Sequence, residues 1–468
     1  MLTPLRAEHG PGAVTGLPDD LFSSIDFTRG VLVAISGGGD STALLLLLKH
    51  YLDRKAPAAP LLAVTVDHDL RPDSGAEART VARLCAQHGI PYRTLVWSGD
   101  KPSTGLPAAA REARYRLLAD AAKDADIGMI VTGHTADDQV ETVSMRLMRT
   151  QSAGPRHERG LAGMAPATLY DWSVWIVRPL LRARRQALRE FLNREGVGWI
   201  EDPTNTDENF ERPRVRAALH GNHAALRFAD GVAAATGAAA LREDVGRRAA
   251  ALIRRFASQP APGLVRLDPA FADGDRHAAV TAMRMLLATV GGTPFPPDAA
   301  RTAALVDKFG TPGLCATLSR TVIDARRTGI FLRRELRDLP AASIVTDGMI
   351  WDGRRRINFR DEPGSLLIET RDAKAAATRP TPESSIPDSL LRAANAAEPT
   401  FRRNPARPAL SPGKPLEAEI SPLVAPFARF LPSFDLDLAE AVADLVGAPA
   451  LPVLPLAGLH AGKQAGKA

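Results

Sequence analysis

Cysteine is nearly absent from this chain. Only Cys85 and Cys315 occur among 468 residues, too few and too far apart for a disulfide framework or a cysteine-rich metal site. Long apolar runs are also missing, because the leucine run Leu44–Leu48 ends at Lys49, far short of the ~20 residues that a membrane span needs. Residues 1–30 lack the apolar core of a signal peptide. We therefore expect a soluble cytoplasmic protein without a membrane partner.

Neither sign of charge dominates the composition. Lys and Arg number 59 against 53 Asp and Glu, which gives a formal charge of +6 and a pI near 9.5. This excess favours a polyanionic partner, and a solvated basic surface explains it comparably well. The chain is longer than one hydrophobic core usually organises, so two or three domains are expected. The sequence does not determine an oligomeric state.

Short β-branched runs alternate with helical stretches in the first third of the chain. The expected strands are Val31–Ile35, Leu61–Val66 and Ile127–Val131, and the expected helices are Thr42–Leu52 and Ser74–His88. This βαβα order predicts an α/β fold in which helices flank a parallel sheet. Ligands of such sheets bind at the carboxyl ends of the strands, where the polar segments of this chain also fall.

A glycine-rich loop joins the first expected strand to the first helix. Its members are Ser36, Gly37, Gly38, Gly39, Asp40 and Ser41. Glycines allow positive φ and close approach of a ligand, while the amides and dipole of a helix N-terminus attract phosphate. The two serines add hydroxyl donors, and Asp40 suits a Mg²⁺ ion that bridges phosphates.

Two common phosphate loops do not match these residues. No lysine stands where a Walker loop has Gly-Lys-Ser/Thr, and Thr42 stands where a dinucleotide loop has a small residue. An ordinary strand-to-helix turn capped by Ser41 is the remaining structural alternative. It gives no reason for an aspartate among three glycines, so we favour a site for the phosphates of ATP.

Two further groups of polar residues fall near the expected site, one after the second expected strand and one on a later helix. Asp67 and His68 end the second strand at the sheet edge that carries the glycine loop. Arg111 and Arg114 are three apart on a helix and share a face. Two guanidinium groups repel unless an anion lies between them or each has its own carboxylate, and both arrangements remain open.

A further polar segment follows the strand Ile127–Val131. His134, Asp138 and Glu141 fall at helical spacing that places them on one side. A structural alternative exists for the acids, in which Thr135 and Asp138 form a capping box and Asp137 complements the helix dipole. It leaves His134 and Glu141 unexplained.

These segments together resemble a known enzyme family. The glycine loop matches the Ser-Gly-Gly-x-Asp-Ser signature of the PP-loop ATP pyrophosphatase superfamily. The segment Val66–Arg71 and the Glu-Asp-Pro-Thr-Asn segment from Glu201 to Asn205 resemble those of the tRNA(Ile)-lysidine synthetases, with Arg212 and Arg216 downstream. The resemblance covers about Val31 to Arg216, under half of the chain.

Two stretches depart from the family pattern. Asp69 stands where the family usually has glycine, and because Asp tolerates a left-handed backbone better than most residues, we expect the turn to persist. The loop Arg149–Arg159, which precedes the segment Gly160–Met164, also differs from the family in length and composition. We expect this loop to keep its role.

The resemblance implies a ligase that uses ATP and Mg²⁺. Such an enzyme adenylylates the wobble cytidine of an isoleucine tRNA with a CAU anticodon, and the ε-amine of free lysine then displaces AMP to give lysidine. The implied catalytic residues are Asp40, Arg114, His134, Asp137 and Asp138. ATP would be bound by Ser36, Gly37, Gly38, Gly39, Asp40, Ser41, Asp67 and His68, with Asp40 as the metal ligand. The tRNA and lysine would be bound by Asp138, Glu141, Asn205, Arg212 and Arg216.

The rest of the chain divides by composition. Helical periodicity from 217 to 256 and a mixture of one helix with short strands after Gly263 indicate a connector and a small α+β domain. We expect an N-terminal tail (1–29), a PP-loop ATP-binding catalytic domain (30–216), a helical connector (217–258), a C-terminal tRNA-binding domain (259–372), a low-complexity linker (373–422) and a C-terminal tail (423–468). Candidate contacts to the tRNA backbone are Arg182, Arg184, Arg185, Arg189, Arg326, Arg327, Arg333 and Arg334.

Three other functions compete with this one. A tRNA thiolation enzyme of the same fold needs a nucleophilic or cluster-binding cysteine, and neither Cys85 nor Cys315 is near a motif. An amidotransferase of the kind that makes GMP would need a glutaminase domain, for which the N-terminal tail is too short. A tRNA-binding protein that has lost catalysis would not be expected to retain Asp40, Arg114, His134 and Asp138.

Overall fold

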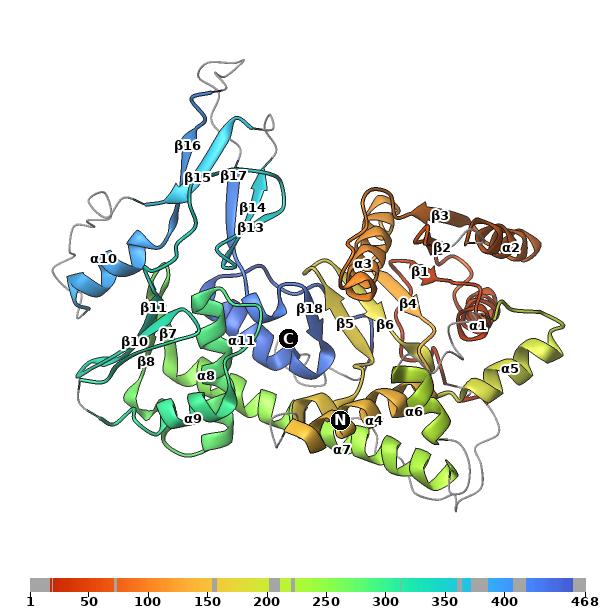
Figure 1. Ribbon diagram of the computed structural model, residues 1–468, viewed down its shortest axis with the longest axis horizontal. Coiled ribbons are helices and arrows are strands. Elements are labelled where there is room, and N and C mark those ends of the chain that lie inside the picture. The colour runs from red at the N-terminus through yellow and green to blue at the C-terminus, as the bar shows by residue number, and fades with distance from the viewer. Residues whose placement is uncertain are drawn as a thin grey trace, which may run out of the picture. The chain divides into compact units, whose positions relative to one another are not determined.

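A computed structural model describes most of the chain, which divides into two compact units (Figure 1). The described residues are 17–18, 20–70, 74–153, 158–201, 211–219, 224–311, 313–359, 364–371, 386–406 and 418–457. The first unit comprises residues 1–241 and 452–468, and the second comprises residues 242–451. The boundary falls inside the expected connector 217–258, because the single helix α7 (Ala224–Phe256) runs through it.

A mainly parallel sheet forms the centre of the first unit. Its strands lie in the order β5-β6-β4-β1-β2-β3, and every neighbouring pair is parallel except β5 with β6. Their bounds are β1 Val31–Ala34, β2 Leu61–Asp67, β3 Tyr92–Val96, β4 Met129–Thr132, β5 Ala167–Tyr170 and β6 Val174–Val177. Because β1, β2 and β4 are parallel, their carboxyl ends meet at one sheet edge.

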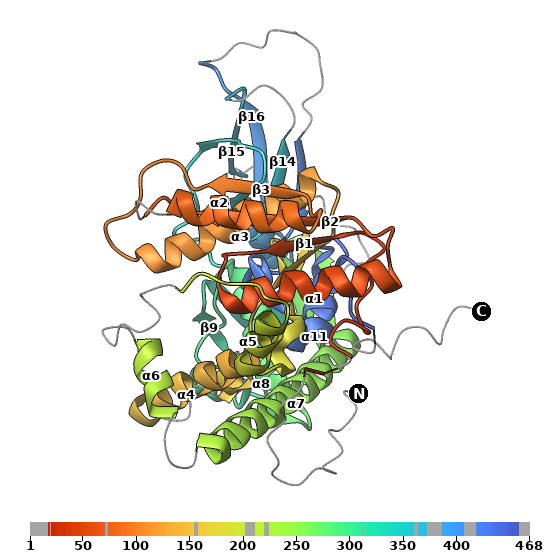
Figure 2. The same cartoon turned by 90° about the vertical axis from the view of Figure 1, so that its right-hand side faces the viewer.

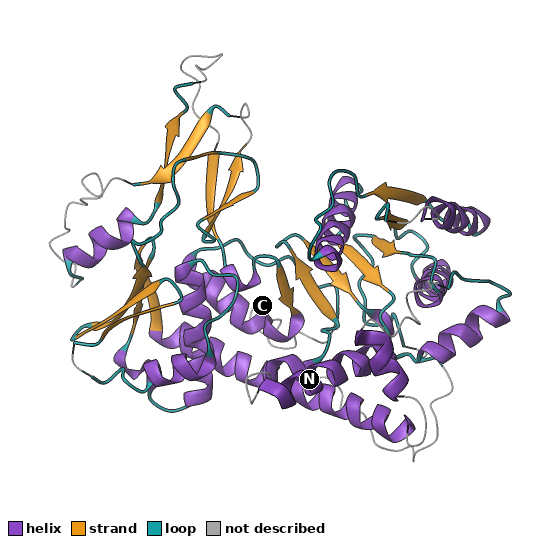
Figure 3. Ribbon diagram, viewed as in Figure 1, coloured by secondary structure: helices purple, strands orange, loops and turns teal. Residues whose placement is uncertain are grey.

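Helices flank this sheet, as Figure 3 shows in purple and orange. They are α1 Gly39–Lys55, α2 Ser74–Gln87, α3 Leu106–Asp124, α4 Ala136–Ala153, α5 Arg185–Arg194 and α6 Glu211–Leu219. In Figure 2, α1, α2 and α3 lie alongside the strands β1, β2 and β3. The expected α/β fold with a parallel sheet is confirmed.

Two details of this unit differ from expectation. Helix α1 begins at Gly39 rather than Thr42, so Asp40 and Ser41 lie in its first turn. The edge strand β3 is not among the expected strands. None of its residues is fully buried, so it lacks the continuous apolar run that marks a central strand.

The described residues of the second unit form three antiparallel sheets. One sheet has the order β7-β8-β11-β10-β9, and two smaller ones have the orders β12-β15-β16 and β13-β14-β17. The strands of the first are β7 Ala257–Ala261, β8 Leu264–Leu267, β9 Cys315–Leu318, β10 Thr321–Arg326 and β11 Gly329–Arg334. Those of the others are β12 Ser343–Ile344, β13 Met349–Trp351, β14 Arg355–Phe359, β15 Leu366–Thr370, β16 Pro399–Arg403 and β17 Ala418–Pro422.

Helices and a second apolar core complete this unit. Helix α8 (Arg276–Gly291) is buried from Ala278 to its end except at Arg284, and it packs on β10 and β11. The two smaller sheets share a core that includes Trp351, Ile357 and Ile368. The remaining elements are α9 Ala299–Val306, α10 Asp388–Ala396, β18 Phe430–Pro432 and α11 Leu436–Val446.

The expected low-complexity linker, 373–422, is wrong for the part of it that the structure describes. Helix α10 buries Leu390 and Ala394 against Leu264 and Phe331, and β16 and β17 are members of the two smaller sheets. The alanine-rich and proline-rich composition concealed an amphipathic helix of only nine residues. Residues 372–385 and 407–417 lie outside the described part of the chain.

The two expected tails also contain folded segments. Ile25 forms a β-bridge with Leu456, and Phe22 packs against the ring of Tyr51, so part of the segment 1–29 belongs to the first unit. Helix α11, within 423–468, buries most of its apolar residues. Among the described residues, no helix combines the length and the hydropathy needed to cross a bilayer.

Candidate active site

The glycine loop leads directly from β1 into the first turn of α1. Gly37 has φ of +84°, and a side chain there would place Cβ 2.6 Å from Cδ1 of Ile200. The carbonyl of Gly37 accepts a hydrogen bond from the Ile200 amide at 2.9 Å. Both the left-handed backbone and the close contact therefore require glycine at this position.

Serine hydroxyls fix the shape of this loop. The Ser41 hydroxyl donates to the Gly38 carbonyl at 3.0 Å and accepts from the Ser36 amide at 3.2 Å. Gly38 is the N-cap of α1 and provides no side-chain cap, so the alternative of a turn capped by Ser41 is wrong. The first amides of α1 have no side-chain acceptor at the N-cap, which leaves a helix N-terminus suited to phosphate.

The segment after β4 packs closely on this loop. A Cβ atom at Gly133 would lie 3.0 Å from the backbone of Asp40 and Ser41, so glycine allows the two segments to meet. The neighbouring His134 places Nδ1 2.9 Å from the Thr132 hydroxyl. Burial, together with the positive charges of Arg178 and other arginines, lowers the pKa of His134 well below 6.5. The imidazole is therefore uncharged at neutral pH.

Asp67 and His68 lie at the end of β2, as expected. The Asp67 carboxylate accepts a hydrogen bond from the Asp69 amide at 2.8 Å, and Asp69 has φ of +51°. The expectation that aspartate keeps this left-handed turn is confirmed. His68 stacks edge-to-face on Trp97, with ring centroids 5.9 Å apart. Burial lowers the pKa of His68, and Arg114 lowers it further.

Arg111 and Arg114 of α3 have no carboxylate partner among the described residues. Their guanidinium carbons lie 4.9 Å (Arg111) and 5.4 Å (Arg114) from the ring centre of Tyr115. Arg114 is half-buried, and its charge lowers the pKa values of His68 and His134. The charges of these arginines therefore make this sheet edge more positive.

Asp138 caps helix α4 and also contacts two arginines. Its Oδ2 accepts from the Thr135 amide at 2.8 Å and from the Thr135 hydroxyl at 2.9 Å, while its own amide contacts that hydroxyl at 3.3 Å. This is the expected capping box of α4. Its Oδ1 accepts from Arg185 at 2.9 Å and from Arg212 at 3.2 Å. The cap therefore positions one carboxylate oxygen to face the arginines.

Glu141 lies one turn further along α4 and is almost fully enclosed. Its side chain is 2% exposed and contacts three guanidinium groups. The nearest nitrogen atoms lie at 2.8 Å for Arg216, 2.9 Å for Arg212 and 3.2 Å for Arg185. Arg212 and Arg216 come from α6, which packs on α4. The structure thus brings these three expected substrate-binding residues together.

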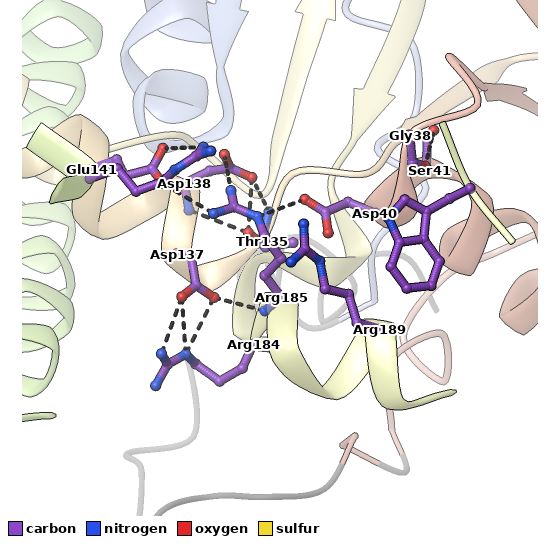
Figure 4. A network of polar contacts seen from close by, with 12 residues as sticks. Gly38, Asp40, Ser41, Thr135, Asp137, Asp138, Glu141, Arg184, Arg185 and Arg189 are labelled. Carbon is purple, nitrogen blue, oxygen red and sulfur yellow. Dashed lines mark hydrogen bonds and ion pairs between the residues drawn. The ribbon is translucent and has the colours of Figure 1, made fainter. Parts of the chain in front are cut away.

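Arg185 connects this cluster to the glycine loop (Figure 4). Its Nε donates to Oδ2 of Asp40 at 3.1 Å, while its two terminal nitrogens reach Asp138 and Glu141. Burial raises the pKa of Asp40, and the positive charge of Arg185 opposes that rise. Arg185 was expected to contact the tRNA backbone; that expectation is wrong for this structure, because its side chain lies within the carboxylate cluster.

Asp137 points away from Asp40 in Figure 4 and supports the start of α5. Its carboxylate accepts from the Arg185 amide at 2.8 Å and from the Arg184 guanidinium at 3.1 Å. Arg184 also covers the ring of Phe228, with 3.7 Å between its Cζ and the ring centre. These contacts explain how Asp137 positions Arg185, and they give no contact between Asp137 and the glycine loop.

The segment Gly160–Met164 is held by α4. Gln139 donates to the Met164 carbonyl at 2.8 Å and accepts from the Met164 amide at 2.6 Å. Gly163 has φ of +66°, and a Cβ atom there would meet the Gln139 side chain. Gln139 therefore needs glycine at position 163, and sequence reasoning missed its hydrogen bonds to Met164, 25 residues away.

The structure describes only some of the remaining residues that were predicted to form the site or to contact tRNA. Trp199 lies over Gly39, and its indole donates to Glu201, which also pairs with Arg189. Asn205 and Arg71 lie outside the described residues. Arg334 is wrong as a candidate tRNA contact, because its side chain is fully buried in the second unit. Within the described residues, no three His, Cys, Asp or Glu side chains are grouped to hold a metal ion.

Comparison with known proteins identifies the class to which this loop and sheet belong. A family model described as a PP-loop domain matches residues 19–222. A solved structure, the U34-tRNA thiolase NcsA from Methanococcus maripaludis, matches 47% of this chain and 77% of its own with 15% identity and a TM-score of 0.40, a score too low to support an inference. The chain is thus a PP-loop protein that uses ATP.

Two curated relatives define the family more closely. A tRNA(Ile)-lysidine synthase from Mesorhizobium japonicum is 59% identical over 94% of this chain and 97% of its own length. One from Brucella ovis is 40% identical over 70% of this chain and 73% of its own. The chain belongs to the tRNA(Ile)-lysidine synthase family and is therefore an enzyme, a ligase that forms carbon–nitrogen bonds. The family and the enzyme class expected from the motifs are confirmed.

Proposed function

We propose that this enzyme converts the wobble cytidine of an isoleucine tRNA with a CAU anticodon to lysidine in the cytoplasm. In the first step, cytosine O2 attacks the α-phosphorus of ATP, and the bond to the β-phosphate breaks to release pyrophosphate. In the second step, the ε-nitrogen of lysine attacks C2, and the C2–O2 bond breaks to release AMP. The observation that carries the proposal is the link through Arg185 between the phosphate loop and a cluster of carboxylates.

The phosphates of ATP would lie on the glycine loop and the first turn of α1. The amides there point out of a helix N-terminus without a side-chain cap, and the charge of Arg114 acts on His134, next to the Gly133 that packs on this loop. These groups would stabilise the negative charge that develops on the phosphates as pyrophosphate leaves. Asp67 and His68, at the adjacent strand end, would contact the nucleotide.

Asp40 would hold a Mg²⁺ ion. Its Oδ2 accepts a hydrogen bond from Arg185, and among the described residues its Oδ1 has no hydrogen-bond donor. A single carboxylate fits this metal, which commonly combines one or two carboxylates with substrate phosphates and water. When bound, Mg²⁺ would neutralise phosphate charge during the first step.

Asp138 would bind the lysine amine in the second step. Free lysine has a side-chain pKa of about 10.4, so its ammonium group must bind to an acceptor and lose a proton before it can attack. Oδ1 of Asp138 faces the cluster and would accept the ammonium, with Glu141 beside it. The uncharged imidazole of His134 adds no positive charge to repel the amine and would orient the adenylate by hydrogen bonding.

The second unit would bind the body of the tRNA, as we expect for residues 259–372. Arg327 is exposed, and Arg326 is half-exposed beside Asp324. Arg212 and Arg216 would also reach the substrate from α6. If the exposed arginines contact phosphates, tRNA affinity falls as salt rises, with a slope that decreases when an arginine is removed.

Release of pyrophosphate tests this function. The purified full-length enzyme is mixed with Mg²⁺-ATP, lysine and unmodified CAU-anticodon isoleucine tRNA, and parallel mixtures lack tRNA or contain a tRNA with another anticodon. We expect release only with the CAU-anticodon tRNA. Release that is independent of tRNA, or none in the complete mixture, would contradict the proposal.

A further inference from the structure

The carboxylates proposed to bind lysine already have all their acceptor positions filled. A carboxylate offers about four lone-pair positions. Asp138 accepts two hydrogen bonds from Thr135, one from Arg185 and one from Arg212. Glu141 accepts one from Arg185, one from Arg212 and two from Arg216. A lysine ammonium therefore has to displace an arginine from either carboxylate.

Arg185 is the arginine best placed to leave. Among the described carboxylates, Arg212 contacts Asp138 and Glu141 and Arg216 contacts Glu141, whereas Arg185 also reaches Asp40 in the first turn of α1. Figure 4 shows its guanidinium between Asp40 and the acids of α4. It is thus the arginine of this cluster that contacts both the phosphate loop and the proposed lysine site.

Local helix electrostatics also favour the departure of Arg185. It is the first residue of α5, next to the N-cap Arg184, and no acidic residue lies in the first turn. A positive side chain at a helix N-terminus is destabilised by the helix dipole. The carboxylates compensate for that cost, and the phosphates of ATP offer the same guanidinium a stronger anion.

We propose that Arg185 makes lysine binding depend on ATP, because bound phosphates draw its guanidinium from Asp138 and Glu141 and so release acceptor positions for the lysine ammonium. Arg185 is then a positioning residue, and the inference rests on the function proposed for Asp138. Without ATP the arginine occupies the place of the amine. Since binding equilibria are reciprocal, lysine must also tighten ATP binding by the same factor.

Equilibrium dialysis of radiolabelled lysine tests this coupling in the full-length enzyme. Lysine affinity is measured alone and with Mg²⁺ and the α,β-methylene analogue of ATP, which is not cleaved at the reacting bond. In the wild type we expect lysine to bind about ten-fold tighter with the analogue, within the usual range for coupled sites. In the absence of nucleotide, lysine should bind Arg185→Gln more tightly than it binds the wild type. The ratio of lysine affinities with and without the analogue should approach one in this variant.

Two further variants separate coupling from folding. Arg194→Gln removes the same charge from an exposed position of α5 and should keep the wild-type ratio. Arg185→Lys keeps the charge but cannot span three carboxylates, so it should give an intermediate ratio. Circular dichroism melts establish that each variant is folded. If Arg185→Gln does not fold, Arg185→Lys provides the test. A wild-type ratio of lysine affinities with and without the analogue in Arg185→Lys would then overturn the proposal.

Several results would overturn the inference without affecting the proposed function. An equal lysine affinity with and without the analogue in the wild type is one, and a wild-type ratio in a folded Arg185→Gln is another. Loss of lysine binding in Arg185→Gln under both conditions would also overturn it, because Arg185 would then help to bind lysine. Failure of the wild type to attach lysine to tRNA would instead refute the proposed function.

Discussion

Arginines surround carboxylates in both units of this chain, but the two clusters differ in their exposure. In the second unit, Asp352 and Glu398 share Arg354, and Asp352 also binds Arg334 and Arg320, of which Arg320 alone is 36% exposed. The side chains of Asp352 and Arg334 are 0% exposed, and that of Arg354 is 3% exposed. In the first unit, the arginines around Glu141 are 18% to 43% exposed. We call the cluster of Asp138, Glu141 and their arginines the open cluster, because its arginines are partly exposed. We call the cluster of Asp352, Glu398 and their arginines the closed cluster.

The partners of the two clusters differ as well. Arg354 also donates to the Ala397 carbonyl, and Arg334 donates to three carbonyls of the segment 335–338, so these arginines tie backbone segments together. Arg185 contacts Asp40, which lies in the first turn of α1 and keeps one carboxylate oxygen without a donor among the described residues. We infer that the closed cluster of the second unit stabilises the fold, whereas the open cluster of the first unit, at the sheet edge, exchanges partners with a ligand.

The largest expected effect is on the stability of the second unit. Asp352→Asn would leave the fully buried Arg334 without its carboxylate and Arg354 with Glu398 alone, and breaking such a buried pair costs about 3–5 kcal/mol. Urea unfolding followed by circular dichroism measures the loss. The exposed ion pair between Asp307 and Arg276 offers a control. Asp307→Asn should hardly change the urea concentration at the midpoint of unfolding. An equally small shift for Asp352→Asn would show that the closed cluster is not structural.

Asp40→Asn should affect catalysis in the open cluster rather than stability. Loss of a preorganised electrostatic group commonly lowers kcat by about 10²- to 10³-fold, so tRNA-dependent pyrophosphate release should fall to that extent. Because burial already raises the pKa of Asp40, the neutral side chain should fold normally. Asp53→Asn, an exposed position of the same helix, should keep wild-type release. A full rate in Asp40→Asn would contradict the assigned role.

Asp138→Asn should separate the two chemical steps. The amide oxygen can keep the cap on Thr135, but the charge that would hold the lysine ammonium is lost. A hydrogen bond to a charged group is worth about 1.5–3 kcal/mol, so lysine incorporation should fall about ten- to hundred-fold while pyrophosphate release falls much less. Parallel assays of labelled lysine on tRNA and of pyrophosphate measure both steps. Equal losses would exclude this division of roles.

The smallest expected effect is a pH dependence of stability caused by His134. Its pKa in the folded enzyme lies well below 6.5, so the unfolded chain binds more protons as the pH falls below about 6.5. Stability should therefore decrease as the pH falls from 6.5 through the folded pKa. His134→Gln should flatten this dependence in urea unfolding at pH 7.5, 6.5 and 5.5. An unchanged slope would show that folding does not lower the pKa of His134.

Much of the open site could be predicted from local sequence. The glycine loop, Asp67 and His134 each follow a strand of one parallel sheet, and such strand ends must meet at the same edge. The capping box of Thr135 and Asp138 is a contact over three residues and was also visible. Arg185 was not placed correctly, because it lies 44 residues or more from the acids it binds. Only the packing of α5 against α1 brings it to Asp40.

The closed cluster could not be predicted for a related reason. Asp352 and Arg354 are neighbours, but Glu398 reaches Arg354 only because β16 pairs with β15 and α10 packs on β11. The strands of this unit are short, and the segment around α10 is rich in alanine and proline. Neither the periodicity of apolar residues nor the composition indicates a helix or strand in such short segments. The sequence therefore suggested a linker where the structure has a helix and two strands.

Mass spectrometry of the tRNA product tests the proposed function most directly. CAU-anticodon isoleucine tRNA is incubated with the full-length enzyme, Mg²⁺-ATP and lysine, then digested, and the anticodon fragment is compared with a mixture lacking ATP. We expect the wobble cytidine to gain the mass of one lysine minus one water, only when both ATP and lysine are present. An unmodified cytidine in the complete mixture, or a mass gain of sulfur, would contradict the proposed function.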